Sequence, residues 1–288
     1  MNDPRPVAER PSPLLPVPVP HDDRVDASRR SDVDQWGRSE RYRSLARRVF
    51  DPVYRHWFRA EWEGIEHIPS TGGALLVANH AGAIPADAPV ILHGVELHLG
   101  RPLYLLGEYV FWAMPLVGTL FSRFGGVAAH PENAQRLLAE EQQLVLAYPE
   151  GTKGTSKTWL ERYRLRRFGR AGFVETAMRA GVPVVPIAVV GSEEAMPTLY
   201  NSAALARLVG APYAPLTANM VAFGPLGLVA FFPAKFRLRV LEPVSFDVPP
   251  GRERYSTSRV MEAGEAIRLR IQEALQDMLA TRKSVWFG

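Results

Sequence analysis

The 288-residue chain contains no cysteine. It therefore cannot form disulfides, iron–sulfur clusters or zinc sites with thiolate ligands, and it has no cysteine nucleophile. Because a cysteine-free protein works in any redox environment, this absence does not identify a compartment. The first residues, Met1 to Pro6, are not followed by an apolar run. We therefore expect no signal peptide.

Long uninterrupted hydrophobic runs are also missing. The two nearest approaches cover residues 103–121, interrupted by Glu108, Pro115 and Gly118, and residues 216–233, interrupted by Pro225 and two glycines. Helix breakers in the middle of a segment disfavour a membrane-spanning helix. We expect both stretches to be buried or to lie at an interface, with a spanning helix as the less favoured alternative.

The overall amino-acid composition is that of a globular protein with an excess of basic residues. Hydrophobic residues make up 47% and charged residues 22%, and the length suffices for one large domain. The net charge is +4, with a sequence pI of about 9.5. A basic balance suits anionic partners such as lipid headgroups, the phosphates of coenzyme A, or nucleic acid.

The N-terminal region divides into two parts. Residues 1–33 hold seven prolines within the first twenty positions and then a mixed run of charges, which predicts a disordered tail. Residues 34–60 predict amphipathic helices, with Tyr42, Leu45, Val49 and Trp57 on one stripe and arginines on the other face. Asp51-Pro52 predicts a break into two helices. The aromatic stripe could lie in a bilayer interface or pack on the domain, and the pattern favours neither.

Residues 61–288 alternate strand and helix patterns. Apolar strands are predicted at 74–78, 102–106, 144–148, 182–190 and 236–241, and helices at 87–98, 131–141, 169–180 and 258–283. Such alternation predicts an α/β fold: a single domain with a central mixed, largely parallel sheet flanked by helices.

A histidine and an aspartate follow the first of these strands. The segment from Asn79-His80 to Asp87 comes directly after residues 74–78, at the strand end where open α/β folds build their sites. The carboxylate of Asp87 can reach the second imidazole nitrogen of His80, fix its tautomer and stabilise the imidazolium. Taken singly, such a pair is more often a structural hydrogen bond.

A glycine-rich loop with cations follows the strand at 144–148. Pro149-Glu150-Gly151-Thr152-Lys153-Gly154 offers backbone N–H groups that can converge on an anion. A run of cations comes next, and we predict that it clamps a phosphate, although a solvated face is the common alternative. These cations are Lys153, Lys157, Arg162, Arg164, Arg166, Arg167 and Arg170. The loop misses the nucleotide-binding pattern, because Ser156 stands where that pattern has its second glycine.

Another short segment suggests a different enzyme class. Gly191-Ser192-Glu193-Glu194 follows a buried strand, as the nucleophile of a hydrolase would. It lacks the G-x-S-x-G elbow, so we expect Ser192 to be a helix N-cap.

Four blocks together make the chain resemble the glycerolipid and lysophospholipid acyltransferase superfamily. They occur in the family's order and extend over residues 62–244. The blocks are Asn79-His80 with Asp87, Phe124-Gly125-Gly126-Val127, Pro149-Glu150-Gly151-Thr152, and Val182-Pro183-Val184-Val185-Pro186-Ile187. One block alone is weak, whereas four in order are specific.

The resemblance implies a reaction and a set of roles. His80 would deprotonate an acceptor hydroxyl, Asp87 would orient His80, and the alkoxide would attack an acyl thioester. The donor would be acyl-CoA or acyl carrier protein, the acceptor a membrane lipid, and no metal or other cofactor is expected. The expected location is peripheral, on the cytoplasmic face of a membrane. The predicted substrate-binding residues are Asn79, Gly126, Glu150, Gly151, Thr152, Lys153, Lys157, Arg164 and Arg167.

Two departures from the family pattern qualify the acceptor. Six residues separate His80 from Asp87, two more than is usual, as in the branch with monoacylglycerol and diacylglycerol acyltransferase-like proteins. The second block lacks the arginine that holds an acceptor phosphate, since Val127-Ala128-Ala129-His130 follows Gly126. This weakens lysophosphatidate as acceptor and leaves a neutral glycerolipid or another polar lipid. Lys153 replaces an arginine and loses its bidentate fork.

Two other functions compete with acyl transfer. One is a non-catalytic lipid- or acyl-binding protein on the same scaffold, which would not need both His80 and Asp87. The other is a basic nucleic-acid-binding protein, but no nucleic-acid signature accompanies the cations. We therefore expect lipid and thioester partners and no nucleic acid.

Overall fold

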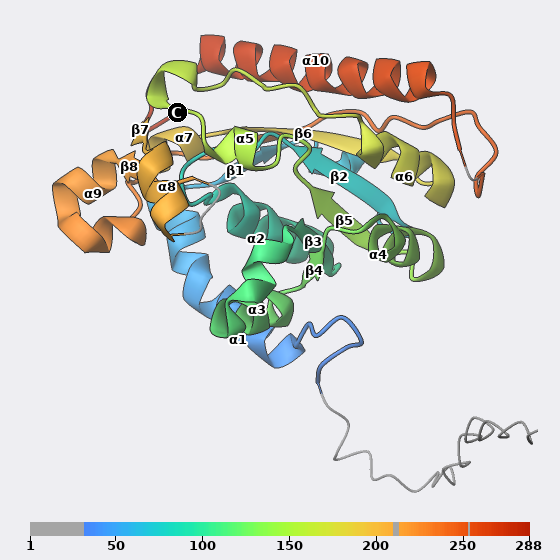
Figure 1. The fold of residues 1–288 in the computed structure, drawn as a ribbon, viewed down its shortest axis with the longest axis horizontal. Coiled ribbons are helices and arrows are strands. Elements are labelled where there is room, and N and C mark those ends of the chain that lie inside the picture. Colours follow the sequence, from blue (N-terminus) through green and yellow to red (C-terminus); the bar gives the residue numbers. More distant parts are fainter. Residues whose placement is uncertain (1–31, 210–212, 253) are drawn as a thin grey trace, which may run out of the picture. The chain divides into compact units, whose positions relative to one another are not determined.

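A seven-stranded sheet forms the centre of the protein (Figure 1). The computed structural model describes residues 32–209, 213–252 and 254–288, so nearly all of the predicted tail, 1–33, lies outside the described residues. The strand order is β1-β9-β6-β2-β5-β3-β4. The strands are β1 (Glu61–Glu63), β2 (Ala74–Ala78), β3 (Leu103–Gly107), β4 (Gly126–Ala128), β5 (Leu144–Ala147), β6 (Val184–Val190) and β9 (Arg237–Val240).

The sheet is mixed and largely parallel, as predicted. Every neighbouring pair is parallel except β6 and β9, which run antiparallel. The central strands β2, β5 and β6 are buried along their whole length. Continuous apolar sequence is typical of strands that are covered on both faces, and this explains why these three were identified from sequence.

Helices cover both faces of the sheet. Side chains of α10 (Thr257–Thr281), α6 (Gly172–Ala180) and the segment after α4 (Pro131–Gln135) form one core with Leu75, Val145 and Ala188. The other core holds α2 (Asp87–Leu99) and the N-terminal segment, packed against Leu76, Leu146 and Ile187. Figure 1 shows α10 lying along one face and α2 on the other. Successive strand residues thus enter opposite cores.

The N-terminal segment is one continuous helical rod, which corrects the predicted break at Asp51-Pro52. Helix α1 (Glu40–Pro52) includes the proline and passes directly into a π-helical turn, Val53–Trp57. The N–H of Phe58 donates to the carbonyl of Val53 at 2.8 Å, a wider ring than in an α-helix. Widening the helix is one way to accommodate backbone groups that a proline leaves without an α-helical partner.

The orientation of helix α1, which the sequence pattern left open, places one arginine inside. Arg43 is buried, and its guanidinium donates two hydrogen bonds to Glu96 of α2, at 2.7 and 3.0 Å. Tyr42, Leu45 and Val49 are exposed instead. The aromatic stripe is therefore divided: Tyr54 and Phe58 enter the core, whereas the first part of the stripe faces outward.

Several short helices and strands form within and around the two interrupted apolar runs. Residues 103–121 form β3, a 3-10 turn (Tyr109–Ala113) and most of α3 (Pro115–Arg123). Residues 198–228 contain β7 (Thr198–Asn201), α8 (Ala203–Val209), β8 (Pro215–Thr217), α9 (Ala218–Phe223) and a 3-10 turn (Gly224–Leu228). Within the described part of the chain, no helix has both the length and the apolar character needed to cross a membrane.

The ion cluster at Glu96 should contribute strongly to stability. Burial alone would raise the pKa of Glu96, but hydrogen bonds and charge from Arg43 and Arg47 hold it below its ordinary value. We expect Glu96→Gln to lower the free energy of unfolding by about 3 kcal/mol at pH 7, because the buried Arg43 loses its carboxylate. Urea unfolding followed by circular dichroism measures this loss.

The same experiment has a control and a pH signature. Glu265→Gln removes a more exposed pair with Arg268 and should cost less than about 1 kcal/mol. Because the folded pKa of Glu96 is lowered, its contribution is present above the ordinary value and is lost as the pH falls below it. A difference between wild type and Glu96→Gln that stayed constant down to acidic pH would contradict this account.

Candidate active site

Three loops meet at one edge of the sheet. Strand β2 pairs in parallel with β5 on one side and with β6 on the other. The loops that follow these strands therefore emerge together, which is where open α/β sheets place their ligands. The short helices α5 (Thr152–Thr155) and α7 (Ser192–Ala195) follow β5 and β6 at this edge (Figure 1).

His80 and Asp87 form a hydrogen-bonded pair in spite of the long spacing between them. The Nδ1 atom of His80 lies 3.2 Å from Oδ2 of Asp87, and the N–H of Ala81 donates to the same oxygen at 3.0 Å. The side chain of Asp87 is fully buried, whereas that of His80 keeps 14% of its surface exposed. With Nδ1 turned to the carboxylate, Nε2 is the nitrogen left to take a proton.

Tyr148 completes the surroundings of His80, a role that no sequence pattern predicts. Its ring stacks on the imidazole with 3.8 Å between the centroids and 19° between the planes. Burial, followed by the charge of Asp87, raises the pKa of Tyr148 well above its ordinary value. The neutral tyrosine thus covers one face of His80 and holds the ring in plane.

Asn79 has a structural role in place of the predicted substrate contact. Its Nδ2 donates to the carbonyl of Val189 at 3.0 Å, and its Oδ1 accepts from the N–H of the same residue at 2.7 Å. The side chain is buried. It therefore extends the pairing of β2 with β6 by one rung and fixes the direction in which His80 leaves the strand.

Glu150 is also an internal anchor. One carboxylate oxygen accepts from the N–H of His80 at 3.3 Å and lies 3.5 Å from Nζ of Lys157. The other oxygen accepts from the N–H of Arg166 at 2.6 Å. A buried carboxylate with this many donors is satisfied within the protein. Glu150 thus connects the loop after β2 with the loop after β5.

Lys157 is buried, although the cation run predicted that it would contact substrate. Its ammonium group pairs with Glu150 and, at 3.3 Å, with Glu193 from the loop after β6. Glu193 also accepts from the N–H of Tyr163 at 2.6 Å. Glu150 belongs to the same loop, but Glu193 follows a different strand, so the position of Lys157 in the sequence could not reveal that pair.

The chain of buried polar groups continues toward the C-terminus. The hydroxyl of Tyr163 donates to Glu194, and Glu194 accepts from Arg282 at 2.8 Å. The Ser192 hydroxyl donates to the carbonyl of Ala81 at 2.8 Å, while Gly191 occupies the N-cap position of α7. This corrects the prediction that Ser192 is the N-cap: the side chain points back to the loop of His80 instead.

The tip of the loop after β5 stays close to His80. Gly151 has φ of +54°, in the region that favours glycine, and Thr152 begins α5. A Cβ at Gly154 would lie 2.6 Å from the carbonyl oxygen of His80, so only glycine permits this approach. Lys153 is exposed. Gly151, Thr152 and Lys153 therefore remain candidates for contact with a substrate.

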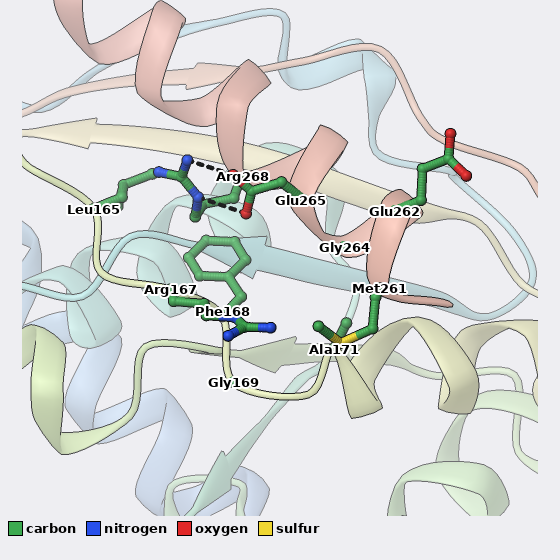
Figure 2. Close-up of a pocket in the computed structure, with 10 residues that line it drawn as sticks. All are labelled: Leu165, Arg167, Phe168, Gly169, Ala171, Met261, Glu262, Gly264, Glu265 and Arg268. Atoms are coloured by element: carbon green, nitrogen blue, oxygen red, sulfur yellow. Dashed lines mark hydrogen bonds and ion pairs between the residues drawn. The ribbon is translucent and has the colours of Figure 1, made fainter. Parts of the chain in front are cut away.

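Gly126 and Arg167 lie in other surroundings. A Cβ at Gly126 would overlap the ring of Phe121, so this glycine permits close packing at the edge strand β4. Arg167 lines a surface cleft of about 610 Å³ between residues 165–171 and α10 (Figure 2). His80 and Asp87 are not among the residues that line it. Arg164 is exposed on the same loop.

Comparison with known proteins tests the family assignment. A family model described as Acyltransferase matches residues 59–190. Uncharacterised proteins of Mycobacterium tuberculosis (strain H37Rv) and Mycobacterium leprae are 38% and 39% identical over 259 residues. These matches cover 89% of this chain and 72% and 70% of the relatives. The chain belongs to the glycerolipid acyltransferase superfamily.

More distant relatives agree with this assignment. A human protein named "DGAT1/2-independent enzyme synthesizing storage lipids" is 25% identical over 194 residues. The match covers 66% of this chain and 55% of the human protein. The crystal structure of the 1-acyl-sn-glycerophosphate acyltransferase PlsC from Thermotoga maritima superimposes with a TM-score of 0.53 at 20% identity. The superposition covers 83% of this chain and 80% of the PlsC chain, and it confirms the predicted fold.

The buried acid Glu193 predicts a pH effect on stability. Burial, opposed in part by Lys157, raises the pKa of Glu193 to about 7. The folded state therefore holds a proton that the unfolded state releases at lower pH, and stability falls as the pH rises from about 4.5 to above 7. Glu193→Gln keeps the shape and removes this titration.

We expect the stability of Glu193→Gln relative to wild type to rise by on the order of 2 kcal/mol between pH 5 and pH 8. Urea denaturation of both proteins at several pH values measures the difference. Glu273→Gln, at an exposed carboxylate on α10, serves as the control and should show no such trend. A pH-independent difference for Glu193→Gln would contradict the assignment.

Proposed function

We propose that this acyltransferase moves a fatty acyl group from a thioester to a hydroxyl of a membrane glycerolipid or lysophospholipid, with His80 as general base. The observation that carries the proposal is the buried Asp87 carboxylate 3.2 Å from Nδ1 of a partly exposed His80. This arrangement stabilises an imidazolium and orients the opposite nitrogen toward a substrate.

The proposed reaction proceeds in two balanced steps. Nε2 of His80 takes the proton of the acceptor hydroxyl while that oxygen attacks the thioester carbonyl carbon. The resulting tetrahedral centre then collapses, the carbon–sulfur bond breaks, and the leaving thiolate takes the proton back from the imidazolium. The products are an ester and a free thiol, and the enzyme is regenerated without a covalent acyl intermediate, a metal or another cofactor.

The proposed donor is acyl-CoA or acyl carrier protein, both of which carry phosphate next to the thiol arm. Lys153 and Arg164 are exposed on the loop that follows β5. Neither takes part in the buried ion pairs that Lys157 forms with Glu150 and Glu193. These two cations are therefore the candidates for contact with an anionic donor.

Within the proposed acceptor class, the chain favours a neutral glycerolipid. Residues 126–130, at and after β4, contain no lysine or arginine that could hold an acceptor phosphate. The human relative is named for the synthesis of storage lipids, which supports the same choice. A lysophospholipid remains the second acceptor in this proposal.

We place the enzyme on the cytoplasmic face of a membrane, as a peripheral protein. The outward side of α1 supports this location, because exposed Leu45 and Val49 alternate there with exposed Arg48. Apolar side chains interleaved with cations suit the boundary between acyl chains and anionic headgroups.

Substitution of His80 provides the test of the mechanism. We expect His80→Ala to lower kcat by about 10³-fold and Asp87→Asn by a smaller factor of at least ~10², since general-base catalysis contributes about this much. The measurement is release of free thiol from acyl-CoA in the presence of diacylglycerol or lysophospholipid vesicles. His130→Ala, at an exposed histidine after β4, is the matched control and should retain wild-type activity.

Analysis of the product lipids distinguishes acyl transfer from non-catalytic lipid binding. Lipid mass spectrometry after expression of wild type and His80→Ala should show which acylated species depend on the histidine, and thereby name the acceptor. If wild type bound acyl-CoA and lipid with no transfer under any acceptor, the non-catalytic lipid-binding protein would replace the proposal.

A further inference from the structure

A segment between β6 and β9 has an unusual composition and lies at the active-site edge. We call residues 198–208 and 213–231 the apolar insert. Arg207 is the one charged residue in these two stretches. Figure 1 shows α8 and α9 grouped with β7 and β8 beside α7, at the end of the sheet where β6 finishes. The antiparallel strands β6 and β9 could be joined by a far shorter connection.

The apolar side chains of the insert point outward. In its first half, Leu199, Tyr200 and Leu208 are 48%, 61% and 82% exposed. In its second half, Val221 and Leu226 are 68% and 70% exposed. Single exposed leucines are ordinary on soluble proteins, whereas so many exposed apolar side chains within one short, nearly uncharged segment point to an interaction surface.

Polar side chains occupy the interior of the insert. Thr217 and Asn219 are fully buried, and Nδ2 of Asn219 donates to the carbonyls of Ala195 and Ala230 at 3.0 and 2.7 Å. Thr217 caps α9 by accepting from the N–H of Met220 at 3.1 Å. The insert is therefore held together by hydrogen bonds inside, and its apolar groups are left for the surroundings.

The insert is fastened to both catalytic loops. The hydroxyl of Tyr213 donates to the carbonyl of Ala83, in the loop between His80 and Asp87, at 2.8 Å. Nδ2 of Asn201 donates to the carbonyl of Ser156, in the loop after β5, at 2.6 Å. A surface bound by the insert would therefore lie close to the loops that carry His80 and Glu150.

The insert also adjoins the outward side of the N-terminal helix. Nε1 of Trp57 donates to the carbonyl of Phe231 at 3.0 Å, and the Trp57 ring is 47% exposed. Exposed Arg48 and Arg55 lie on the same helical rod. An apolar surface bordered by an aromatic ring and cations matches a bilayer, in which acyl chains lie beneath anionic headgroups.

We propose that the apolar insert enters the acyl-chain region of one lipid leaflet and docks the active-site edge on the bilayer. This inference rests on the proposed function, because a lipid acceptor must pass from that leaflet to His80. The bilayer is favoured over a protein partner because the exposed side chains come from several short elements with almost no charge among them, so they lack the polar rim that typical protein interfaces show.

Vesicle binding tests the inference with matched leucines. The double variant Leu208→Asp/Leu226→Asp alters the insert, and Leu97→Asp/Leu269→Asp alters two exposed leucines on α2 and α10. Binding to vesicles of phosphatidylcholine and phosphatidylglycerol in equal parts is measured by co-sedimentation. We expect the insert variant to lose about 100-fold in partitioning, because each leucine withheld from hydrocarbon weakens it about tenfold. The control pair should bind like wild type.

The absence of native cysteine allows a second measurement on singly labelled protein. Leu226→Cys and Leu269→Cys can each carry one environment-sensitive fluorophore. On vesicles, the label at 226 should shift to the blue and be quenched by lipids with spin labels in their acyl chains, whereas the label at 269 should do neither. Equal behaviour of the two labels would overturn the proposal, even if the aspartate variant failed to fold.

Activity measurements separate failure of docking from failure of the proposed function. On a short-chain acceptor dissolved as monomers, the insert variant should match wild type, and His80→Ala should be inactive. On vesicles, both should be inactive. Vesicle binding by wild type without any transfer would refute the function and leave the docking intact. An insert variant that bound vesicles like wild type, or that only converted a dimer to a monomer, would refute the docking.

Discussion

The placement of His80, the proposed general base, depends on one buried carboxylate, that of Glu150. It accepts from the backbone of His80 and of Arg166 and pairs with Lys157, so it ties the loop after β2 to the loop after β5. Lys157 in turn reaches Glu193 after β6. Burial raises the pKa of Glu193 to about 7, even though the charge of Lys157 opposes this shift. The three loops thus form one electrostatic unit.

The fold and the contact between His80 and Asp87 could be predicted from the sequence because both depend on local patterns. Strands β2, β5 and β6 are apolar on both faces, and they are the only strands among the described residues that are buried at every position. His80 and Asp87 belong to one turn between a strand and a helix, so their contact needs only a local bend.

The roles of the other polar residues could not be predicted, since their partners are distant in sequence. Lys157 belongs to a run of cations, a pattern that predicts contact with a phosphate. In the structure it pairs with Glu193, which follows β6 in the sequence. Asn79 was expected to contact substrate, yet its amide continues the pairing with β6. Sequence identifies the residue types of a site, whereas tertiary pairing decides which of them remain accessible to a ligand.

The apolar insert and α1 share one departure from the pattern of a water-soluble protein. In α1, Arg43 is drawn inward by Glu96 and leaves Leu45 and Val49 outside. In the insert, Asn219 and Thr217 are inside, while Val221 and Leu226 are outside. Binary patterning assumes water as the surrounding solvent, so it predicts the opposite orientation for both segments. If hydrocarbon is the solvent on this side of the protein, as the proposed docking requires, the same physical rule accounts for both.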